Sequence, residues 1–338
     1  MLNLDSKWHC FPTVSIFWWT RILMEKSELT IWRTIEIRKG IGQKPKLSVQ
    51  IDGKSANFPL PDRQLPDRIC FEDLQIEYID HSVIEFLRSN KHIWDRNGTK
   101  LDFTVNSSDG IESDVQPVWD IFVREIWPVF ATNIRQLDFD DADHLDNLRR
   151  RTSPTILNDL DQLHSIETYL RLTDEIADDG PNATVGQALS KWLHTPSKNG
   201  QPKEFHCCDY SDPPNLGWIN SLKETFIRAT DSSVSYKIDF DFCGPSKIHL
   251  KPFELVNEQT KEKLTLKKKE DAYWLLKRCP IIVGETAATD QWENDENWDD
   301  NLNNVKFNLW GGSINCIGPL SPQAEEEVRQ RFENWHFI

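Results

Sequence analysis

The sequence lacks the short motifs that identify several classes of enzyme. It contains no C-x-x-C pair, no H-E-x-x-H signature and no G-x-S-x-G turn around a nucleophilic serine. The first two absences argue against common metal-binding spacings, and the third argues against the serine turn of α/β-hydrolases. GIGQK (residues 40–44) has no third glycine, so a glycine-rich phosphate loop is also missing. We therefore expect no cofactor and no metal.

Basic residues are too few for nucleic acid binding. The chain has 54 Asp and Glu against 39 Lys and Arg, a formal charge of -15 that repels phosphate. The only lysine run, Lys267 to Lys269, is followed by Glu270 and Asp271 and favours a solvated hairpin. WHCFPTVSIFWWTRILM near the N-terminus lacks a cleavage site and falls short of the about 20 apolar residues that span a bilayer.

Cysteines are also sparse and scattered. Their number is seven, which is odd, and no close pair other than Cys207 and Cys208 occurs. This usage is typical of a reducing compartment. We expect a cytoplasmic or nuclear protein that binds neither nucleic acid nor membrane.

Strands are predicted near both ends of the chain. Alternating, β-branched segments cover 29–39 and 45–60, with Asp52 and Gly53 as a hairpin turn. Two more strands are expected within 248–269, joined by a polar loop near Asn257 to Lys261, and a third in DAYWLLKRCPIIV (271–283). VKFNLW (305–310) reads as a late strand. Ser321 is expected to cap a final helix.

Between these ends, short strands alternate with segments of helical period. In TVGQALSKWLHTP, for example, Thr184 and Gln187 have capping-box spacing, and the helix should stop before Pro196. The pattern repeats every 27 to 36 residues, which indicates one recurring supersecondary unit. The expected strand centres are Ile76, Phe103, Phe139, Leu172, Cys207 and Ile238.

Polar residues stand between the apolar positions of these strands. A doubly wound sheet is covered on both faces, and its strands would be continuously apolar. We therefore predict an α/β fold of irregular, leucine-rich-repeat-like strand-helix repeats with a parallel sheet, flanked by antiparallel β elements at both ends. The polar positions include Gln75, Glu77, Asp102, Thr104, Asp138, Asp140, Arg171, Thr173, His206, Lys237, Asp239 and Asp241.

Four segments are expected along the chain. Residues 1–28 form an N-terminal extension, and 29–246 form the repeat domain with its N-terminal β hairpin. Residues 247–283 form a β cap, and 284–338 hold an acidic loop, a strand and a C-terminal helix. The acidic loop contains Trp292 and Trp298.

Three adjacent residues, Asp80, His81 and Ser82, have the types of a catalytic triad. Adjacent side chains diverge, whereas triad members converge from separate parts of a chain. Ser82 and Glu85 instead have the spacing of a capping box before an apolar helical run, so we predict a strand-helix joint. The acidic run DFDDADHLD (138–146) lacks the glycine of a calcium loop. We assign no catalytic residue.

The candidate functional residues are therefore those that a partner protein would contact. The polar strand positions would share one solvated face, and tryptophan is enriched at interface hot spots. The partner-binding candidates are Gln75, Glu77, Asp102, Asp138, Asp140, Arg171, Asp239, Asp241, Trp292 and Trp298.

Several blocks in the same order resemble the F-box-containing proteins of plant-parasitic cyst nematodes. The resemblance covers about 29–283 and implies the substrate-recognition region of a cullin-RING ubiquitin ligase, held by an N-terminal F-box on a Skp-type adaptor. The segment 1–28 is expected to keep at most a remnant of that F-box. The blocks are LPDRICFEDLQIEYIDHSVIEFLRSNKHIWDRNGTKL, RRRTSPTILNDL, QALSKWLHTPSKNGQPKEF, PFELVNEQTKEKLTL and AYWLLKRCPI.

We expect a protein-interaction module and not an enzyme. Two alternatives stay open: a hydrolase that uses paired carboxylates, and a decoy that binds the partner without recruiting the ligase. Skp-type adaptor and cullin are expected as partners only with an F-box upstream.

Overall fold

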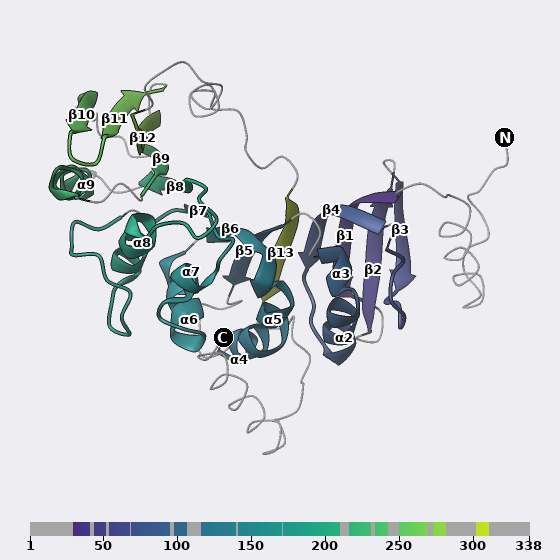
Figure 1. Cartoon of the computed structure of the whole chain (residues 1–338). Coiled ribbons are helices and arrows are strands. Elements are labelled where there is room, and N and C mark those ends of the chain that lie inside the picture. Colours follow the sequence, from purple (N-terminus) through teal and green to yellow (C-terminus); the bar gives the residue numbers. More distant parts are fainter. Residues whose placement is uncertain are drawn as a thin grey trace.

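The computed structural model in Figure 1 contains one long sheet with helices packed against one of its faces. The ranges that the structure describes are 30–40, 44–51, 54–67, 69–94, 98–106, 116–139, 141–170, 172–209, 216–230, 234–242, 250–269, 273–281 and 302–310. The expected N-terminal extension, the helix from Ser321 and most of the acidic loop lie outside these residues.

The sheet has thirteen strands in the order β10-β11-β12-β9-β8-β7-β6-β5-β13-β4-β1-β2-β3. Strands β9 to β1 in this order run parallel, and the pairs toward either end are antiparallel. The bounds are β1 Thr30–Lys39, β2 Pro45–Ile51, β3 Lys54–Pro59, β4 Ile69–Ile76, β5 Thr99–Asn106, β6 Ile134–Phe139, β7 Ser165–Thr168, β8 Lys203–Asp209, β9 Tyr236–Phe242, β10 Phe253–Asn257, β11 Glu262–Lys268, β12 Tyr273–Pro280 and β13 Asn303–Trp310.

Helical segments connect the parallel strands. The capping box predicted at Thr184 and Gln187 is present, and its helix ends at His194, before Pro196. The bounds are α2 His81–Ser89, α3 Lys91–Trp94, α4 Gln116–Ile121, the π-helical η3 Phe122–Ile126, α5 Trp127–Phe130, the 3₁₀ turn η4 Ala131–Asn133, α6 Ala142–Arg151, α7 Ile156–Asp159, α8 Val185–His194 and α9 Gly217–Arg228.

The two faces of the sheet differ in burial. Along β9, every second side chain from Tyr236 to Phe242 is buried and those between are half-buried. The buried side chains face the helices, which Figure 1 shows on one side of the strands. We call the other side the open face. The predicted fold class, an α/β strand-helix repeat with a parallel sheet and antiparallel strands at both ends, is confirmed.

The place of β13 was not predicted. It was expected as a strand, but it lies between β4 and β5 and is parallel to both, so the first two repeat strands are not neighbours. Val305 and Phe307 are fully buried there, and the Phe307 ring lies 5.1 Å from Phe122 and 6.0 Å from Phe130. The late strand thus completes the core of the early repeats.

The fourth repeat strand lies earlier than expected. The prediction centred it on Leu172, whereas β7 covers Ser165–Thr168. Ile166 is fully buried and aligns with Leu137 of β6 and Phe205 of β8. Leu172 is also buried, so its apolar character reflects packing after the strand.

Helix α2 begins with a different cap from the one predicted. Asp80, not Ser82, is the cap residue, and its Oδ1 accepts a hydrogen bond from the backbone N of Val83 at 3.0 Å. The Ser82 hydroxyl donates to the same Oδ1 at 2.7 Å. The Asp80-His81-Ser82 run is therefore a strand-helix joint, but the predicted box of Ser82 and Glu85 is wrong because the helix starts two residues earlier, at His81.

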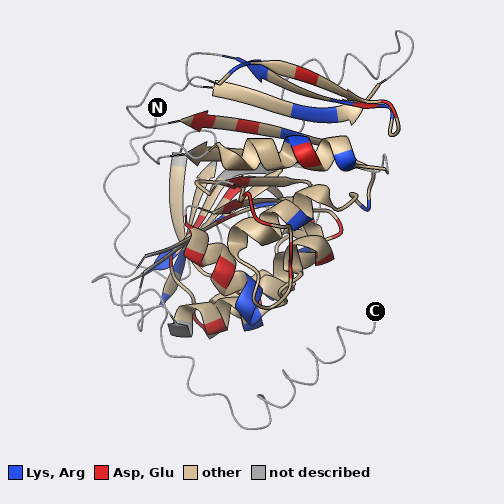
Figure 2. Ribbon diagram, turned by 90° about the vertical axis from the view of Figure 1, so that its left-hand side faces the viewer, with Lys and Arg blue, Asp and Glu red and all other residues tan. Residues whose placement is uncertain are grey.

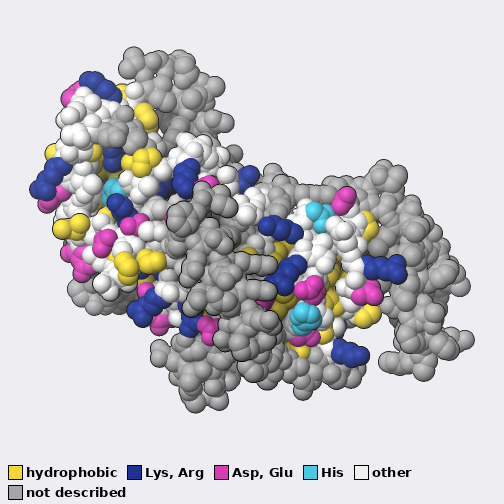
Figure 3. Space-filling model, turned by 60° about the horizontal axis from the view of Figure 1, so that its bottom comes forward, with side chains coloured by type: hydrophobic (Ala, Val, Ile, Leu, Met, Phe, Trp, Pro, Cys, Tyr) yellow, Lys and Arg dark blue, Asp and Glu magenta, His cyan; other side chains and the backbone are white. Residues whose placement is uncertain are grey.

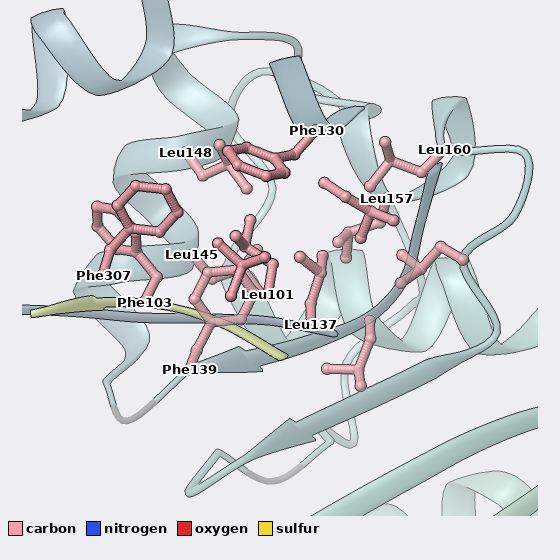
Figure 4. Close-up of a cluster of buried hydrophobic side chains, with 14 of the residues drawn as sticks. Leu101, Phe103, Phe130, Leu137, Phe139, Leu145, Leu148, Leu157, Leu160 and Phe307 are labelled. Carbon is pink, nitrogen blue, oxygen red and sulfur yellow. The ribbon is translucent and has the colours of Figure 1, made fainter. Parts of the chain in front are cut away.

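The core between sheet and helices is apolar and aromatic. Figure 4 shows Leu137 and Phe139 of β6 below Leu148 of α6 and Phe130, which lie side by side, with Leu145 of α6 between the two levels. All five side chains are at most 2% exposed. At about 25 cal/mol per Å², this burial stabilises the packing of the helices on one face and leaves the open face to polar side chains.

Candidate functional site on the open face

One row of polar side chains crosses the open face from β4 to β9. Each member aligns with the next on the neighbouring strand, so the register brings residues far apart in sequence side by side. We call this the polar row. Its members, in spatial order, are Gln75, Lys306, Asp102, Asp138, Glu167, His206 and Asp239.

The middle of the row is a carboxylate pair that shares one cation. Lys100 of β5 places its Nζ 3.3 Å from Asp138 Oδ2 and 2.9 Å from Glu167 Oε2. Gln136 Nε2 donates to the same Glu167 oxygen at 3.3 Å. The Asp138 side chain is 20% exposed, whereas Glu167 is 48% exposed. A partner that approaches this face would meet Glu167 before Asp138.

Asp138 has a strongly shifted pKa. Burial and the nearby charges of Glu167 and Asp102 raise the pKa of Asp138 to about 6, against the opposing charge of Lys100. For Lys100, burial would lower the pKa, but the hydrogen bond and charge of Glu167, with Asp138, raise it overall. The group therefore holds charges that repel one another, and Lys100 stays protonated between them.

Ion pairs continue along both arms of the row. On one side, Lys306 Nζ lies 3.6 Å from Asp102 Oδ2. On the other, Asp239 forms ion pairs with two lysines: its Oδ2 lies 3.3 Å from Lys237 Nζ, and its Oδ1 lies 3.2 Å from Lys269 Nζ. The open face is consequently mixed in charge, and its acids are interleaved with lysines.

His206 stands between two carboxylates. Its Nε2 is 3.8 Å from Glu204 Oε2, and its Nδ1 is 3.8 Å from Asp239 Oδ2. Burial alone would raise the pKa of Glu204, but the hydrogen bond with His206 and the charge of Lys237 lower it below its usual value. Glu204 is thus held ionised at neutral pH.

The structure brings together four of the predicted partner-binding residues. Gln75, Asp102, Asp138 and Asp239 all belong to the polar row. Glu77 follows β4 and pairs with Arg38 at 3.1 Å, and Asp241 lies opposite Tyr273. The candidates that lie outside the described residues are Asp140, Arg171, Trp292 and Trp298.

Lys100, Lys306 and Glu167 were not predicted as polar strand positions, and His206 was predicted as one but not as a partner-binding residue. Lys100 and Lys306 alternate with apolar neighbours as clearly as the predicted residues do, and this period of two is the signal that marks them. Glu167 was missed because its strand was placed several residues too late.

The described residues contain no group of three or more His, Cys, Asp or Glu side chains placed to hold a metal ion. None of their helices is long and apolar enough to cross a bilayer. On the side turned forward in Figure 3, charged side chains of both signs are scattered among small apolar patches. The polar row, by contrast, is a connected arrangement.

Comparisons with protein-family models, curated proteins and solved structures found no match to this chain.

Proposed function

We propose that the chain is a protein-interaction module and that the polar row is its docking surface. The observation that carries this proposal is the middle of the row, where Asp138 and Glu167 share Lys100. Asp138 is ionised at neutral pH although burial and two neighbouring acids raise its pKa to about 6. Such a charge costs folding free energy, and residues kept at a cost to stability are typical of functional surfaces.

The shape of the face favours a protein over a small molecule. The row crosses strands from β4 to β9, and parallel strands lie about 4.8 Å apart, so it extends for roughly 30 Å. Alternating acids and lysines along that length would fix the register of a partner with complementary charges. Ion pairs within the row would be exchanged for pairs across the interface.

The proposal is tested by removing three charges from the row in the full chain. We expect D102N/D138N/E167Q to weaken capture of specific cellular partners by about tenfold, because this variant loses three charges at the interface. The control E85Q/D143N/E224Q removes three acids from α2, α6 and α9 and should capture as the wild type does. Capture is read by quantitative mass spectrometry, and circular dichroism establishes that both variants fold. Equal loss in both variants would contradict docking at the row.

A link to ubiquitin ligases rests on the resemblance to F-box proteins alone. If it holds, the partner at the row is a ligase substrate, a Skp-type adaptor is recruited only by an F-box upstream, and residues 1–28 keep at most a remnant of that F-box. Binding of purified Skp-type adaptor to the chain with and without residues 1–28 tests this step. Partner capture without adaptor binding would instead favour the decoy.

A hydrolase is the second candidate, favoured by the same pair. Asp138, with a pKa of about 6, is suited to general acid catalysis, while Glu167 would be the second carboxylate of the pair. A panel of chromogenic glycoside and ester substrates, assayed with the wild type and D138N, separates the two functions. Turnover that disappears in D138N would establish the enzyme.

A further inference from the structure

The two ends of the sheet are protected to different degrees. An end strand turns alternate N–H and C=O groups away from the sheet, and proteins commonly blunt such edges with lysine or proline. At one end, β3 carries Lys54, Pro59 and the polar residues Ser55 and Asn57. At the other end, β10 has the sequence FELVN, with no lysine and no proline. At β10 the nearest lysine and proline, Lys251 and Pro252, precede the strand, whereas Lys54 and Pro59 lie within β3.

Exposed apolar side chains border β10. Val256 is 49% exposed, and its register opposite Lys263 places it on the open face. Ile227 of α9 is 63% exposed. Lys223, one helical turn before Ile227, lies over the ring of Phe253 at 4.0 Å, so the two helix residues share the side that meets β10.

The local structure around β10 is firmly held. Asn257 Nδ2 donates to the carbonyls of Phe226 at 2.8 Å and Ala229 at 2.9 Å, which ties the end of the strand to α9. Asn257 Oδ1 also accepts from the backbone N of Gln259 at 2.9 Å. The edge is therefore preorganised, and an added strand would not need to order it. Figure 2 views the molecule from this end.

We propose that β10 binds an extended segment of a partner protein, which adds a strand to the sheet. Main-chain hydrogen bonds would supply affinity, and alternate side chains would supply specificity. Residues on the helix side of the added strand would contact Ile227 and Leu255 and should be apolar. A residue opposite Glu254, on the open face, should be basic. This site is separate from the polar row and goes beyond the proposed function.

Charge favours a partner over a second copy of this chain. The described residues 250–269 and 273–281 hold eight Lys and Arg against three Glu. Two copies joined edge to edge at β10 would bring these positive regions together, and the like charges would repel. A single strand of a partner brings far fewer positive charges than a second copy, and a basic residue placed opposite Glu254 would be neutralised by that carboxylate.

The test measures binding of a defined peptide to the full chain. The probe is a fluorescein-labelled octapeptide, KVTVKVTV, and its control is the same peptide with alternate backbone nitrogens methylated, which blocks strand hydrogen bonds. Fluorescence anisotropy should show binding of the first peptide and a loss of at least tenfold with the second. The alternate amides of 253–257 that point away from β11 should gain protection from hydrogen exchange when the first peptide binds.

Variants locate the binding site. V256K and I227D should each weaken peptide binding by at least fivefold, because each puts a charge beside the added strand. I176D changes an isoleucine that is 87% exposed, in the connection between β7 and α8, and should bind as the wild type does. D102N/D138N/E167Q should also bind the peptide normally. A failure of the β10 proposal can therefore be distinguished from a failure of the proposed docking at the polar row.

Three results would overturn the proposal. One is equal binding of the two peptides. Another is full protection of the 253–257 amides before peptide is added, which would mean that the chain covers its own edge. The third is a concentration-dependent dimer in sedimentation that V256K abolishes, which would make β10 an interface between two copies.

Discussion

Asp138 aligns with Glu167 on the neighbouring parallel strand, and Lys100 lies within 3.3 Å of both carboxylates. Two acids that face each other destabilise a sheet unless a cation lies between them. Lys100 supplies that cation from β5. The arrangement gives a single group whose protonation should affect both folding and binding.

D138N should stabilise the protein at neutral pH. The pKa of Asp138 in the folded chain is about 6, above its usual value of 3.8, so the folded state binds the proton more tightly than the unfolded state. Ionisation therefore lowers stability as the pH rises from about 4 to about 6. The substitution should raise the free energy of unfolding at pH 7 by about 1 to 2 kcal/mol.

Urea unfolding at pH 4, 5, 6 and 7 measures this effect. The wild type should lose stability relative to D138N over that range, and the difference should be small at pH 4. D143N, which changes an exposed acid in α6, serves as the control. A difference between D138N and the wild type that is independent of pH would contradict the assigned pKa.

Arg278 and Glu262 form an ion pair in the interior. Arg278 donates to Glu262 Oε2 through Nε at 3.0 Å and through a terminal nitrogen at 2.6 Å, and both side chains are at most 3% exposed. R278M would leave a buried carboxylate without its cation and should cost about 3 to 5 kcal/mol. The double variant R278M/E262L should recover at least half of that loss in urea unfolding. No recovery would mean that the loss comes from packing.

The sequence predicts which face of the sheet a side chain lies on better than it predicts which strands are neighbours. Alternation along YKIDFDF correctly separates buried Ile238 and Phe240 from half-buried Asp239, because the period of a strand is two. The insertion of β13 between β4 and β5 involves contacts across about 200 residues. Local patterns carry no information on such contacts, so the position of Lys306 beside Asp102 could not be predicted.

Where the predicted bounds of an element are wrong by a few residues, the prediction of its functional side chains is wrong too. Glu167 was not predicted because the fourth repeat strand was centred on Leu172. The alternation of apolar and polar residues around Leu172 fits a strand as well as SIET (165–168) does. At α2, Asp80 and Ser82 both have side chains that can cap the N-terminus of a helix. Only the start of the helix, fixed by the packing of Val83 and Ile84, decides in favour of Asp80.

The cap of α2 gives a direct test. D80A removes the acceptor of the Val83 N–H and should destabilise the protein by about 1 kcal/mol. S82A removes only a donor to Asp80 and should cost less than about 0.5 kcal/mol. Thermal or urea unfolding of both variants measures the two costs. A larger loss in S82A than in D80A would restore the capping box that the sequence suggests.

Lys203, the first residue of β8, is buried against the C-terminal end of α8. Its Nζ donates to the carbonyls of Trp192 and Thr195, the latter at 2.6 Å, and lies 4.9 Å from the centre of the Trp192 ring. Burial lowers the pKa of Lys203 to about 7, well below its usual 10.5. The unfolded state therefore binds the proton more tightly between pH 7 and pH 10.5, and stability from this group should rise with pH across that window.

K203M should remove that rise. The slope of the free energy of unfolding against pH should be larger in the wild type than in K203M, by up to about 1.4 kcal/mol per pH unit above pH 7. Urea unfolding at pH 7, 8 and 9 gives both slopes. K191M, which changes an exposed lysine of α8, should keep the wild-type slope. If K203M also kept it, the carbonyls of Trp192 and Thr195 would have to hold Lys203 protonated throughout this range.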